Sequence, residues 1–562
     1  MQVTGPRSFA SDASYVYNGT AAQVTGNALP GQVRNLRTTN ANDVTLTAPV
    51  SIMQVVAVGN TGNLVLNGNA LTLLSGSVGT ALAINSSSGV VSGSTAVVQR
   101  YIDPSLNAGL GYRHYGAPVS GSTVADLSTA GFMPIVNSLY NSSSAPGTTL
   151  PFPTVFGYSE SRATTTTTLS DFDRGWYSPA SLADALTPGI GYTVNIGAAQ
   201  LVDFTGTLTT GTQSLTLHRS SNALPAAAGW ALVSNPYPAP LDYSLVAAAD
   251  RVGLDAAIYV FSSTSQYAGQ YRAYTNGIGG NPVLPVAQGF FVRVSTGQTD
   301  GALTFRNSQR MTLPDATSFQ RTTADPRPLV QLMLAGATGP ADVFYAYAEA
   351  GATAATDAQY DAIKLPNSTG LNLSSVTALG EHLAIDGRPA FGAATSLPLA
   401  VGVPAAGIYT LTAAALSNLP VGLDAYLTDA QAGQTLKLSA GTSYAFRVTE
   451  AQATSLLTGR FTLQFSPQAV LATVPVLTAE LVGIYPNPAH GRFTVTLPGA
   501  APAGVVQADL LNTLGQVVLR QAASLPAAGT QLTLETGSLP AGVYTLRLTT
   551  GPVILAKRVV IY

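Results

Sequence analysis

The sequence predicts an all-β protein of several domains, and three observations lead to this fold class. Short apolar segments recur at intervals of about 8 to 12 residues, as in chains built from many strands. The 562 residues include 55 Gly and 35 Pro, which end strands and form turns. Only 9% of the residues are charged, against roughly 25% in ordinary globular domains, so Thr, Ser, Asn and Gln have to cover the surface.

Residues 1–100 predict a β-solenoid-like coil or its cap. No charged residue lies between Asp43 and Arg100, and short apolar segments repeat throughout this stretch. Stacked coils bury one face of each strand against the next coil, so they require few charges. A sandwich of hairpins is the alternative that the same pattern allows. The repeated segments are VTLT (44–47), SIMQVVAV (51–58), NLVLNG (63–68), ALTLLSG (70–76) and TALAIN (80–85).

Four further segments follow the coil. Residues 101–325 predict an aromatic-rich β-sandwich region, because Tyr and Trp stand beside Gly and Pro at the ends of apolar segments. Residues 326–467 predict a second β-sandwich from about seven short strand patterns. Residues 468–480 form a charge-poor linker. Residues 481–562, hereafter the C-terminal module, predict a small Ig-like β-sandwich.

The C-terminal module carries the most distinctive motifs. The Pro-Asn-Pro segment at 486–488 breaks any helix and sets a turn, after which apolar and polar residues alternate. Further turns are predicted around Gly515 and Gly542, each before an apolar strand pattern. The motifs are, in order, YPNPAHGRFTVTL (485–497), LLNTLGQVVLR (510–520), LPAGVYTLRL (539–548) and AKRVVIY (556–562).

The order of these motifs resembles the type A C-terminal sorting domain of the type IX secretion system, which exports proteins across the outer membrane of certain Gram-negative bacteria. The resemblance implies docking on the export and attachment machinery, then cleavage between about Ala472 and Leu481 and attachment to a lipid anchor or release. Arg492 and Lys557 are the candidate docking charges, and the glycines and prolines shape turns. The motif residues are Pro486, Asn487, Pro488, Gly491, Arg492, Gly515, Gly542, Tyr544 and Lys557. Residues 15–52 and the aromatic motifs of 101–325 also resemble parts of type IX surface proteins.

Composition excludes several classes of function. The net charge of −2 provides no basic surface for nucleic acid. The absence of cysteine excludes disulfides, thiolate metal sites and cysteine nucleophiles. No run of 18 apolar residues is present, so no membrane-spanning helix is predicted. Residues 1–15 lack the pattern of an export signal. The resemblance to the sorting domain implies such a signal, so we expect that the natural N-terminus lies upstream or has been removed.

No motif of a known catalytic site occurs, neither GxSxG nor HExxH, Walker A or Rossmann. The four histidines (114, 218, 382 and 490) are far apart in sequence, so surface or strand-edge positions are favoured over a zinc site. Asp171 and Asp173 could pair their carboxylates, but a loop salt bridge to Arg174 is the favoured interpretation. Asp357, Asp361 and Lys364 are interpreted as edge charges. We predict no catalytic residue, no metal site and no cofactor.

Aromatic residues between positions 235 and 292 give the remaining functional signal. Flat rings at loop tips can stack on sugars, whereas the same rings on strands would fill a core. The candidate glycan or interface aromatics are Tyr237, Tyr267, Tyr271 and Tyr274.

From the sequence we expect a non-catalytic structural or adhesive protein, secreted or on the outer cell surface. Low charge allows copies of the chain to pack together into a surface layer or fibre, because little repulsion opposes contact. A carbohydrate-binding module and an accessory part of a larger secreted hydrolase are the alternatives. The expected partners are the type IX machinery, further copies of the chain and glycans.

Overall fold

The computed structural model describes residues 9–313, 325–453, 455–466, 478–498, 504–526, 529–551 and 553–562. In these ranges strands make up almost all regular structure, accompanied by two four-residue α-helices, α1 (Leu139–Ser142) and α2 (Glu450–Ala453). The all-β prediction is therefore confirmed. Neither described helix is long and apolar enough to cross a membrane. The chain forms two compact units, Met1–Asp325 with Thr356–Thr369, and Pro326–Ala355 with Gly370–Tyr562.

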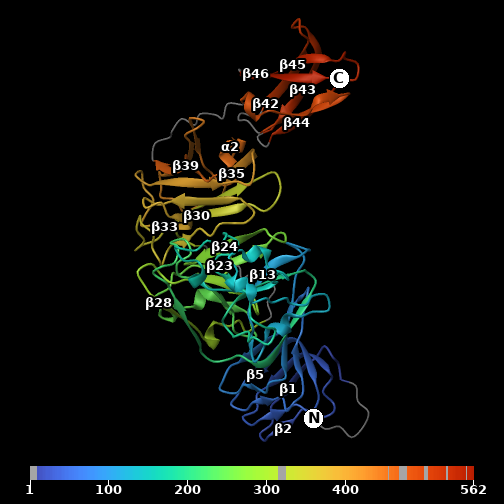
Figure 1. Ribbon diagram of the computed structural model, residues 1–562, viewed down its shortest axis with the longest axis vertical. Coiled ribbons are helices and arrows are strands. Elements are labelled where there is room, and N and C mark those ends of the chain that lie inside the picture. The colour runs from blue at the N-terminus through green and yellow to red at the C-terminus, as the bar shows by residue number, and fades with distance from the viewer. Residues whose placement is uncertain are drawn as a thin grey trace. The chain divides into compact units, whose positions relative to one another are not determined.

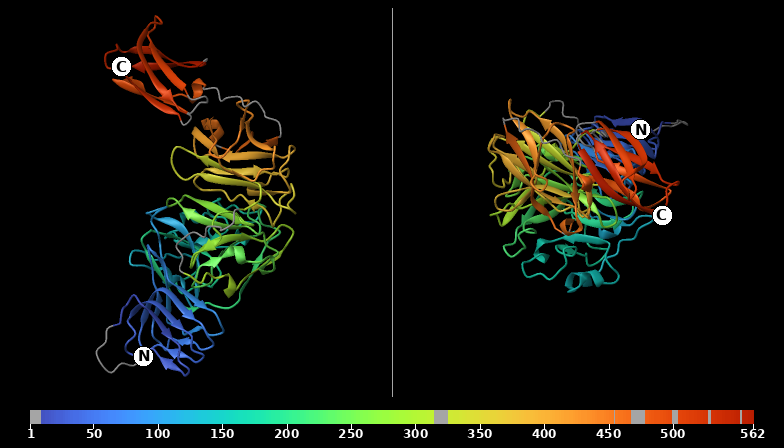
Figure 2. Two further views of the ribbon diagram at one scale, coloured as in Figure 1. Left: turned by 180° about the vertical axis from the view of Figure 1, so that it is seen from behind. Right: turned by 90° about the horizontal axis from the view of Figure 1, so that it is seen from above.

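The first unit begins with two parallel sheets whose strands alternate along the chain (blue in Figures 1 and 2). In the first sheet Ser14 pairs with Asn35, and Val50 pairs with Leu71. In the second sheet Val44 pairs with Leu64. The strands of the first sheet are β1 (Ser14–Tyr17), β3 (Gln32–Thr38), β5 (Val50–Val58), β7 (Leu71–Leu73), β10 (Leu82–Asn85) and β12 (Ala96–Tyr101), and those of the second are β2 (Gln23–Val24), β4 (Val44–Thr45), β6 (Leu64–Val65) and β11 (Val91–Ser92); β8 (Ser75–Gly76) and β9 (Gly79–Thr80) form a hairpin.

Asparagine amides join the turns between these strands. Asn40 Nδ2 donates to the Ala21 carbonyl over 2.7 Å, and Asn60 Nδ2 donates to the Thr39 carbonyl over 3.1 Å. Each bond thus links a turn to another turn about 20 residues earlier in the chain. Gly62 lies so close to an earlier turn that a Cβ atom there would be 2.1 Å from the Asn42 carbonyl oxygen. Asn and Gly are needed at these turns because backbone lies directly on backbone.

The first sheet continues past residue 100 through antiparallel pairing. β12 pairs with β18 (Leu201–Leu208), and β18 pairs with β14 (Val119–Ser120). One apolar core extends from Tyr15 to Ala287 and includes residues of all these strands. The boundary predicted at residue 100 therefore lies inside a continuous sheet and core.

The remainder of the first unit contains smaller antiparallel sheets. Their strands are β13 (Gly111–Tyr115), β17 (Tyr192–Ile196), β15 (Val155–Tyr158) and β16 (Trp176–Tyr177) in one sheet; β20 (Trp230–Ser234), β27 (Gly289–Arg293), β23 (Ile258–Ser263), β24 (Gly269–Thr275) and β25 (Ile278–Gly279) in a second; β19 (Gln213–His218), β28 (Asp300–Phe305) and β22 (Arg251–Val252) in a third; and β21 (Leu241–Asp242) with β26 (Val283–Leu284). The segment Thr356–Thr369 belongs to this unit, where the Asn367 Oδ1 accepts a hydrogen bond from the Tyr271 amide over 2.9 Å.

The second unit contains one large sheet and the C-terminal module. The sheet order is β37-β36-β39-β34-β32-β33-β30-β29-β35-β38. Phe344, Phe446 and Phe461 are fully buried in its apolar core. The strands are β29 (Leu329–Ala335), β30 (Asp342–Ala348), β32 (Asn372–Val376), β33 (His382–Arg388), β34 (Ser396–Gly402), β35 (Gly407–Ser417), β36 (Asp424–Asp429), β37 (Gln434–Lys437), β38 (Ser443–Val448) and β39 (Leu457–Ser466).

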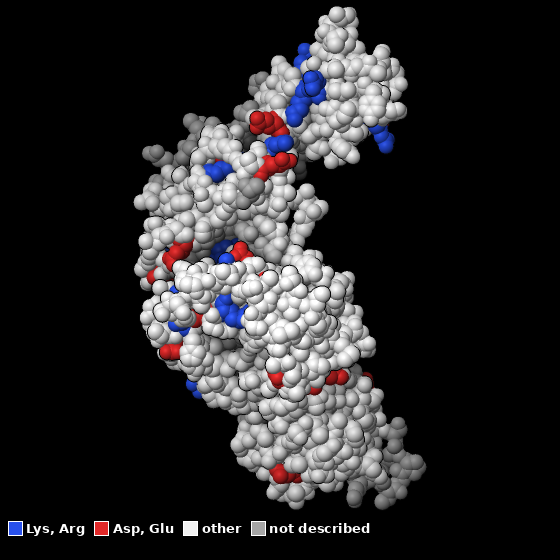
Figure 3. All heavy atoms as spheres, in the orientation of Figure 1, with Lys and Arg blue, Asp and Glu red and all other residues white. Residues whose placement is uncertain are grey.

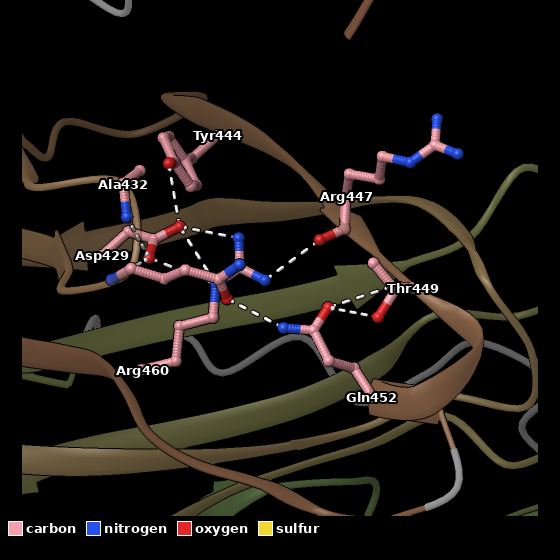
Figure 4. Close-up of polar contacts among 8 residues, drawn as sticks. Asp429, Ala432, Tyr444, Arg447, Thr449, Gln452 and Arg460 are labelled. Atoms are coloured by element: carbon pink, nitrogen blue, oxygen red, sulfur yellow. Dashed lines mark hydrogen bonds and ion pairs between the residues drawn. The ribbon is translucent and has the colours of Figure 1, made fainter. Parts of the chain in front are cut away.

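A buried ion pair joins two neighbouring strands of this sheet, β36 and β39 (Figure 4). The Arg460 guanidinium contacts both carboxylate oxygens of Asp429 at 2.9 to 3.1 Å, and the Tyr444 hydroxyl donates to the same carboxylate over 3.0 Å. The Asp429 side chain is 1% exposed. The guanidinium also lies about 5 Å from the ring centres of Phe446 and Phe461, a cation–π arrangement.

The C-terminal module is a set of seven strands in the order β43-β42-β45-β46-β40-β41-β44. Alternate side chains such as Phe493, Val495 and Leu497 are buried in a separate core, as the alternation in the sequence predicts. The predicted linker 468–480 lies outside the described residues up to position 477. The strands are β40 (Gly483–His490), β41 (Arg492–Leu497), β42 (Gly504–Leu511), β43 (Val517–Leu525), β44 (Thr530–Glu535), β45 (Gly542–Thr550) and β46 (Val553–Ile561).

The two parts of the second unit share a local motif that sequence reasoning missed. GIYTL begins at Gly407 and GVYTL begins at Gly542. In both, the tyrosine hydroxyl donates to the carbonyl four residues earlier: Tyr409 to Ala405 over 2.8 Å, and Tyr544 to Pro540 over 2.7 Å. Each bond fixes the turn into the strand, as a tyrosine corner does in β-sandwiches.

Charged side chains are sparse on the visible face of the molecule (Figure 3). They occur in small groups separated by wide uncharged areas, as the low content of charged residues requires.

We expect Asp429→Asn to lower the free energy of unfolding of the large sheet by about 3 kcal/mol, because it leaves a buried guanidinium without its carboxylate. Hydrogen exchange of β36 and β39 in the full chain measures this loss. Asp424→Asn on the same strand is the matched control. Its carboxylate is 36% exposed and pairs with Lys437, so its loss should cost less than about 1 kcal/mol. Equal effects of the two substitutions would contradict the prediction.

Candidate functional site

The Pro-Asn-Pro segment of the C-terminal module lies within strand β40 and is not the turn that the sequence predicted. The pairing of β40 with β41 is interrupted between Tyr485 and His490, and the asparagine instead bonds the segment to the last strand. The Asn487 Oδ1 accepts from the Val560 amide over 2.9 Å, and its Nδ2 donates to the Arg558 carbonyl over 3.1 Å. The amide side chain therefore takes the place of a neighbouring strand beside β46. Pro486 and Pro488 on either side are exposed, and the peptide bonds before them are both cis.

The glycines of the motif differ in what they do. Gly491 has φ +75° and Gly515 has φ +77°, a region that favours glycine, and both lie in turns between strands. Gly542 has ordinary backbone geometry at the start of β45, and a Cβ atom there would only contact the Tyr544 ring at 3.7 Å. Tyr544 is buried and forms the corner described above. These residues shape the module.

The two candidate docking charges lie in different environments. Arg492 is exposed at the start of β41. Lys557 is half-buried, and its Nζ donates to the Val482 carbonyl over 2.6 Å. Burial lowers the pKa of Lys557. Arg492 therefore remains available to a partner, whereas Lys557 holds its own fold together.

The sequence analysis missed a buried ion-pair network centred on Asp509. It lies on β42, directly opposite Arg520 on one neighbouring strand and Arg547 on the other. Its side chain is 2% exposed and contacts each guanidinium at 2.7 Å. The hydrogen bond from Arg520, with others from Arg547 and Gln507, lowers the pKa of Asp509 to about 2. The only signal in the sequence is an acidic residue at a core-like position in an apolar strand.

The four candidate aromatics do not form one surface. Tyr237 is fully buried, and its hydroxyl donates to the Gly211 carbonyl over 2.6 Å. Tyr274, on β24, is 8% exposed and belongs to an apolar core. These two rings therefore fill the core and cannot stack on a ligand in solution. Tyr267 is 64% exposed, and Tyr271 is half-buried. The sequence could not separate them because all four stand among small and polar residues.

Tyr267 and Tyr271 line a cavity of about 640 Å³ in the first unit, hereafter the aromatic cavity. One wall is the β13-β17-β15-β16 sheet. His114, Thr193 and Phe156 are cross-strand neighbours there, and Tyr112 lies two residues before His114 on the same face. The opposite wall is the β23–β24 hairpin.

The histidine in this cavity lies on β13, the end strand of its sheet, but it is buried and is not at the surface. His114 is 4% exposed, and its ring stacks on Phe261 with centres 5.1 Å apart. Burial lowers the pKa of His114 to about 3, so the imidazole is neutral at pH 7. The alternation Tyr112-Arg-His114 in a strand was the signal that could have placed both rings on one face.

The acidic candidate residues do not come together in one site. Asp171 is exposed and pairs with Arg174 over 2.5 Å, while Asp173 is buried and accepts from the Tyr140 hydroxyl over 2.9 Å. They share a loop, with one carboxylate in solvent and the other inside. Asp361 is buried and accepts from the Asp357 amide. In the described part of the chain, no three His, Asp or Glu residues gather in a group that could hold a metal ion.

Comparison with known families identifies the class of the C-terminal module. Residues 483–562 match the secretion system C-terminal sorting domain. The chain is therefore a type IX secretion substrate, exported to the cell surface or the medium. Residues 10–465 match the family described as a domain of unknown function (DUF8693), and the chain belongs to that family.

Other comparisons add no activity. No curated protein matches the chain. Among solved structures, dimeric latent PorU from Porphyromonas gingivalis is similar at 10% identity, over 71% of this chain and 36% of the PorU chain, with a TM-score of 0.15. The BSP domain of a biofilm associated protein is similar at 10% identity, over 84% of this chain and 90% of its own, with a TM-score of 0.13. At such TM-scores neither likeness carries an argument.

The depressed pKa of Asp509 makes the stability of the C-terminal module dependent on pH. Its carboxylate stabilises the folded module above the unfolded pKa near 4, and this contribution is lost as pH falls through about 2. We expect Asp509→Asn to cost about 1 kcal/mol at pH 7, since solvent screens the two half-exposed guanidinium groups.

Calorimetry of the full chain at several pH values tests this. The difference between the unchanged chain and Asp509→Asn should shrink as the pH falls to about 2. Glu535→Gln, an exposed carboxylate in the same module, is the control and should leave the acid dependence of melting unchanged. A difference that persists unchanged at low pH would disprove the assignment.

Asn487 and Arg492 should affect export for different reasons. Asn487→Ala removes two hydrogen bonds to β46, so we expect both lower stability, by about 1 to 2 kcal/mol, and less export. Arg492→Ala should leave the melting temperature unchanged and still reduce export, if its charge meets the machinery. Export is measured by the protein in medium and surface fractions, with a chain lacking 481–562 as the negative control. Normal export of Arg492→Ala would remove Arg492 from the docking surface.

Proposed function

We propose that this chain is a non-catalytic structural or adhesive protein of the bacterial surface, which packs against further copies of itself. The support is its export by the type IX pathway together with a body built almost wholly of strands and apolar cores. Proteins with little surface charge have little repulsion to oppose such packing.

The position of β1 at the end of its sheet, among the described residues, is the observation that carries this proposal. β1 lies at one end of its sheet and, among the described residues, pairs with β3 alone. Edge strands present unpaired backbone groups to which another chain can add. Val16 in the middle of β1 is 55% exposed, and no charge on β1 protects it. A second copy offers the same kind of strand as a partner.

We further propose that residues 14–98 form a β-coil that acts as a stackable element. The parallel registers, the alternation of strands between two sheets and the Asn40 and Asn60 bonds between turns support this architecture. A coil exposes a strand edge only at its ends, so addition there extends it in one direction. The sandwich architecture proposed for 326–467 and for the C-terminal module rests on their separate cores and on strand pairing that is antiparallel except for β30 with β33 and β40 with β46.

We expect the purified chain to form higher-order species as its concentration rises, because copies can meet at β1. Light scattering and negative-stain imaging measure this. Val16→Lys should reduce these species, since a charged edge opposes strand addition. Val78→Lys is the matched control, the same change at a side chain that is 93% exposed in the β8–β9 turn. Only monomers at every concentration, or equal effects of the two lysines, would contradict assembly through β1.

A further inference from the structure

We propose that the aromatic cavity binds an uncharged aromatic ring that carries one or two hydroxyl or carbonyl groups. The volume of about 640 Å³ lies within the range of about 300 to 1,000 Å³ for small-molecule sites. The site is separate from the sorting motif and from the β1 edge.

Unpartnered polar atoms on three residues that line the cavity are the first argument. Both ring nitrogens of His114, the hydroxyl of Tyr112 and the Oγ1 of Thr193 are buried with no hydrogen-bond partner among the described residues. His114 on β13 and Thr193 on β17 are directly paired residues of neighbouring strands, so their side chains lie side by side on the same face of the sheet. A buried polar group without a partner destabilises a fold by about 1 to 3 kcal/mol. Three such side chains on one cavity wall point to a ligand that supplies the missing bonds.

The aromatic side chains that line the cavity indicate that the ligand has a flat aromatic ring. Phe156 and Tyr140 meet edge-to-face, and Trp176, Phe261 and Tyr271 also line the cavity. Aromatic walls favour a flat ring, which they contact by stacking and edge-to-face packing. Phe172 is 48% exposed and Tyr267 is 64% exposed, and each contacts the Tyr112 ring, at 6.0 and 6.4 Å between centres. They mark the mouth through which a ring can enter.

The polar side chains that line the cavity determine the charge of the ligand and the number of hydroxyl groups it can carry. No Lys or Arg is among the described residues that line the cavity, and its single carboxylate, Asp171, is exposed and paired with Arg174. A charged ligand would therefore lose its hydration without a partner of opposite charge. Neutral His114 offers one donor and one acceptor, which suits a hydroxyl or carbonyl group. A sugar ring would bury several hydroxyls, more than the unpartnered atoms of Tyr112, His114 and Thr193 can bond.

Calorimetric titration of the full chain with three probes tests the proposal. p-Cresol should bind saturably at one site. p-Toluate has the same ring with a carboxylate and should bind at least about tenfold more weakly. Methyl β-D-glucopyranoside is the sugar probe and should not bind in the cavity. Absence of saturable p-cresol binding, or binding of the glucoside in its place, would overturn the proposal.

Substitutions locate the site. His114→Phe keeps an aromatic ring and removes both nitrogens, so p-cresol should bind about tenfold more weakly while the free chain melts at the same or a higher temperature. A purely structural histidine would not give these opposite changes. Tyr267→Ala at the exposed mouth, which leaves the core intact, should weaken binding several-fold. His218→Phe, an exposed histidine on β19, is the matched control and should change nothing. Equal p-cresol affinity in the unchanged chain, His114→Phe and Tyr267→Ala would place binding elsewhere and overturn the proposal.

Discussion

Pairing between neighbouring strands is the constraint on which the whole structure depends, because the chain has no cysteine and few charges to stabilise it in other ways. Two of the buried carboxylates form ion pairs that join strands. Asp429 on β36 meets Arg460 on β39, and Asp509 meets an arginine on each side across two strand pairs. Removing one member of a buried pair is costly even where the intact pair adds little. These pairs therefore act mainly by fixing which strands are neighbours.

Most residues of the sorting motif have structural roles in the C-terminal module. Asn487 completes the hydrogen bonding of β46, Gly491 and Gly515 take backbone conformations that other residues avoid, and Tyr544 closes a turn. Most residues of the motif are thus accounted for by the geometry of a small β module. Recognition by the export machinery has to use what this geometry leaves on the surface, and Arg492 is the charged residue of the motif that is exposed there.

The aromatic cavity brings several buried, unpartnered polar atoms together on neighbouring strands. Such atoms also occur elsewhere among the described residues, for example the Tyr243 hydroxyl and the Thr38 Oγ1, whereas here an imidazole and two hydroxyls lie on β13 and β17. Such an arrangement lowers stability, so its presence in one wall of a cavity is best explained by binding. The cavity and the β1 edge are independent features, and a surface protein can use both.

The sequence by itself determined that the protein is all-β, that it is exported by the type IX pathway, and which alternate residues of the C-terminal strands are buried. These properties follow from local patterns: periodicity two, turn residues, and motifs in fixed order. Tertiary structure decided that the first sheet runs past residue 100, that Tyr237 is core while Tyr267 is exposed, and that His114 lies beside Thr193. Those outcomes depend on contacts between residues far apart in sequence, here about 80 positions for His114 and Thr193, and no local pattern specifies such pairs.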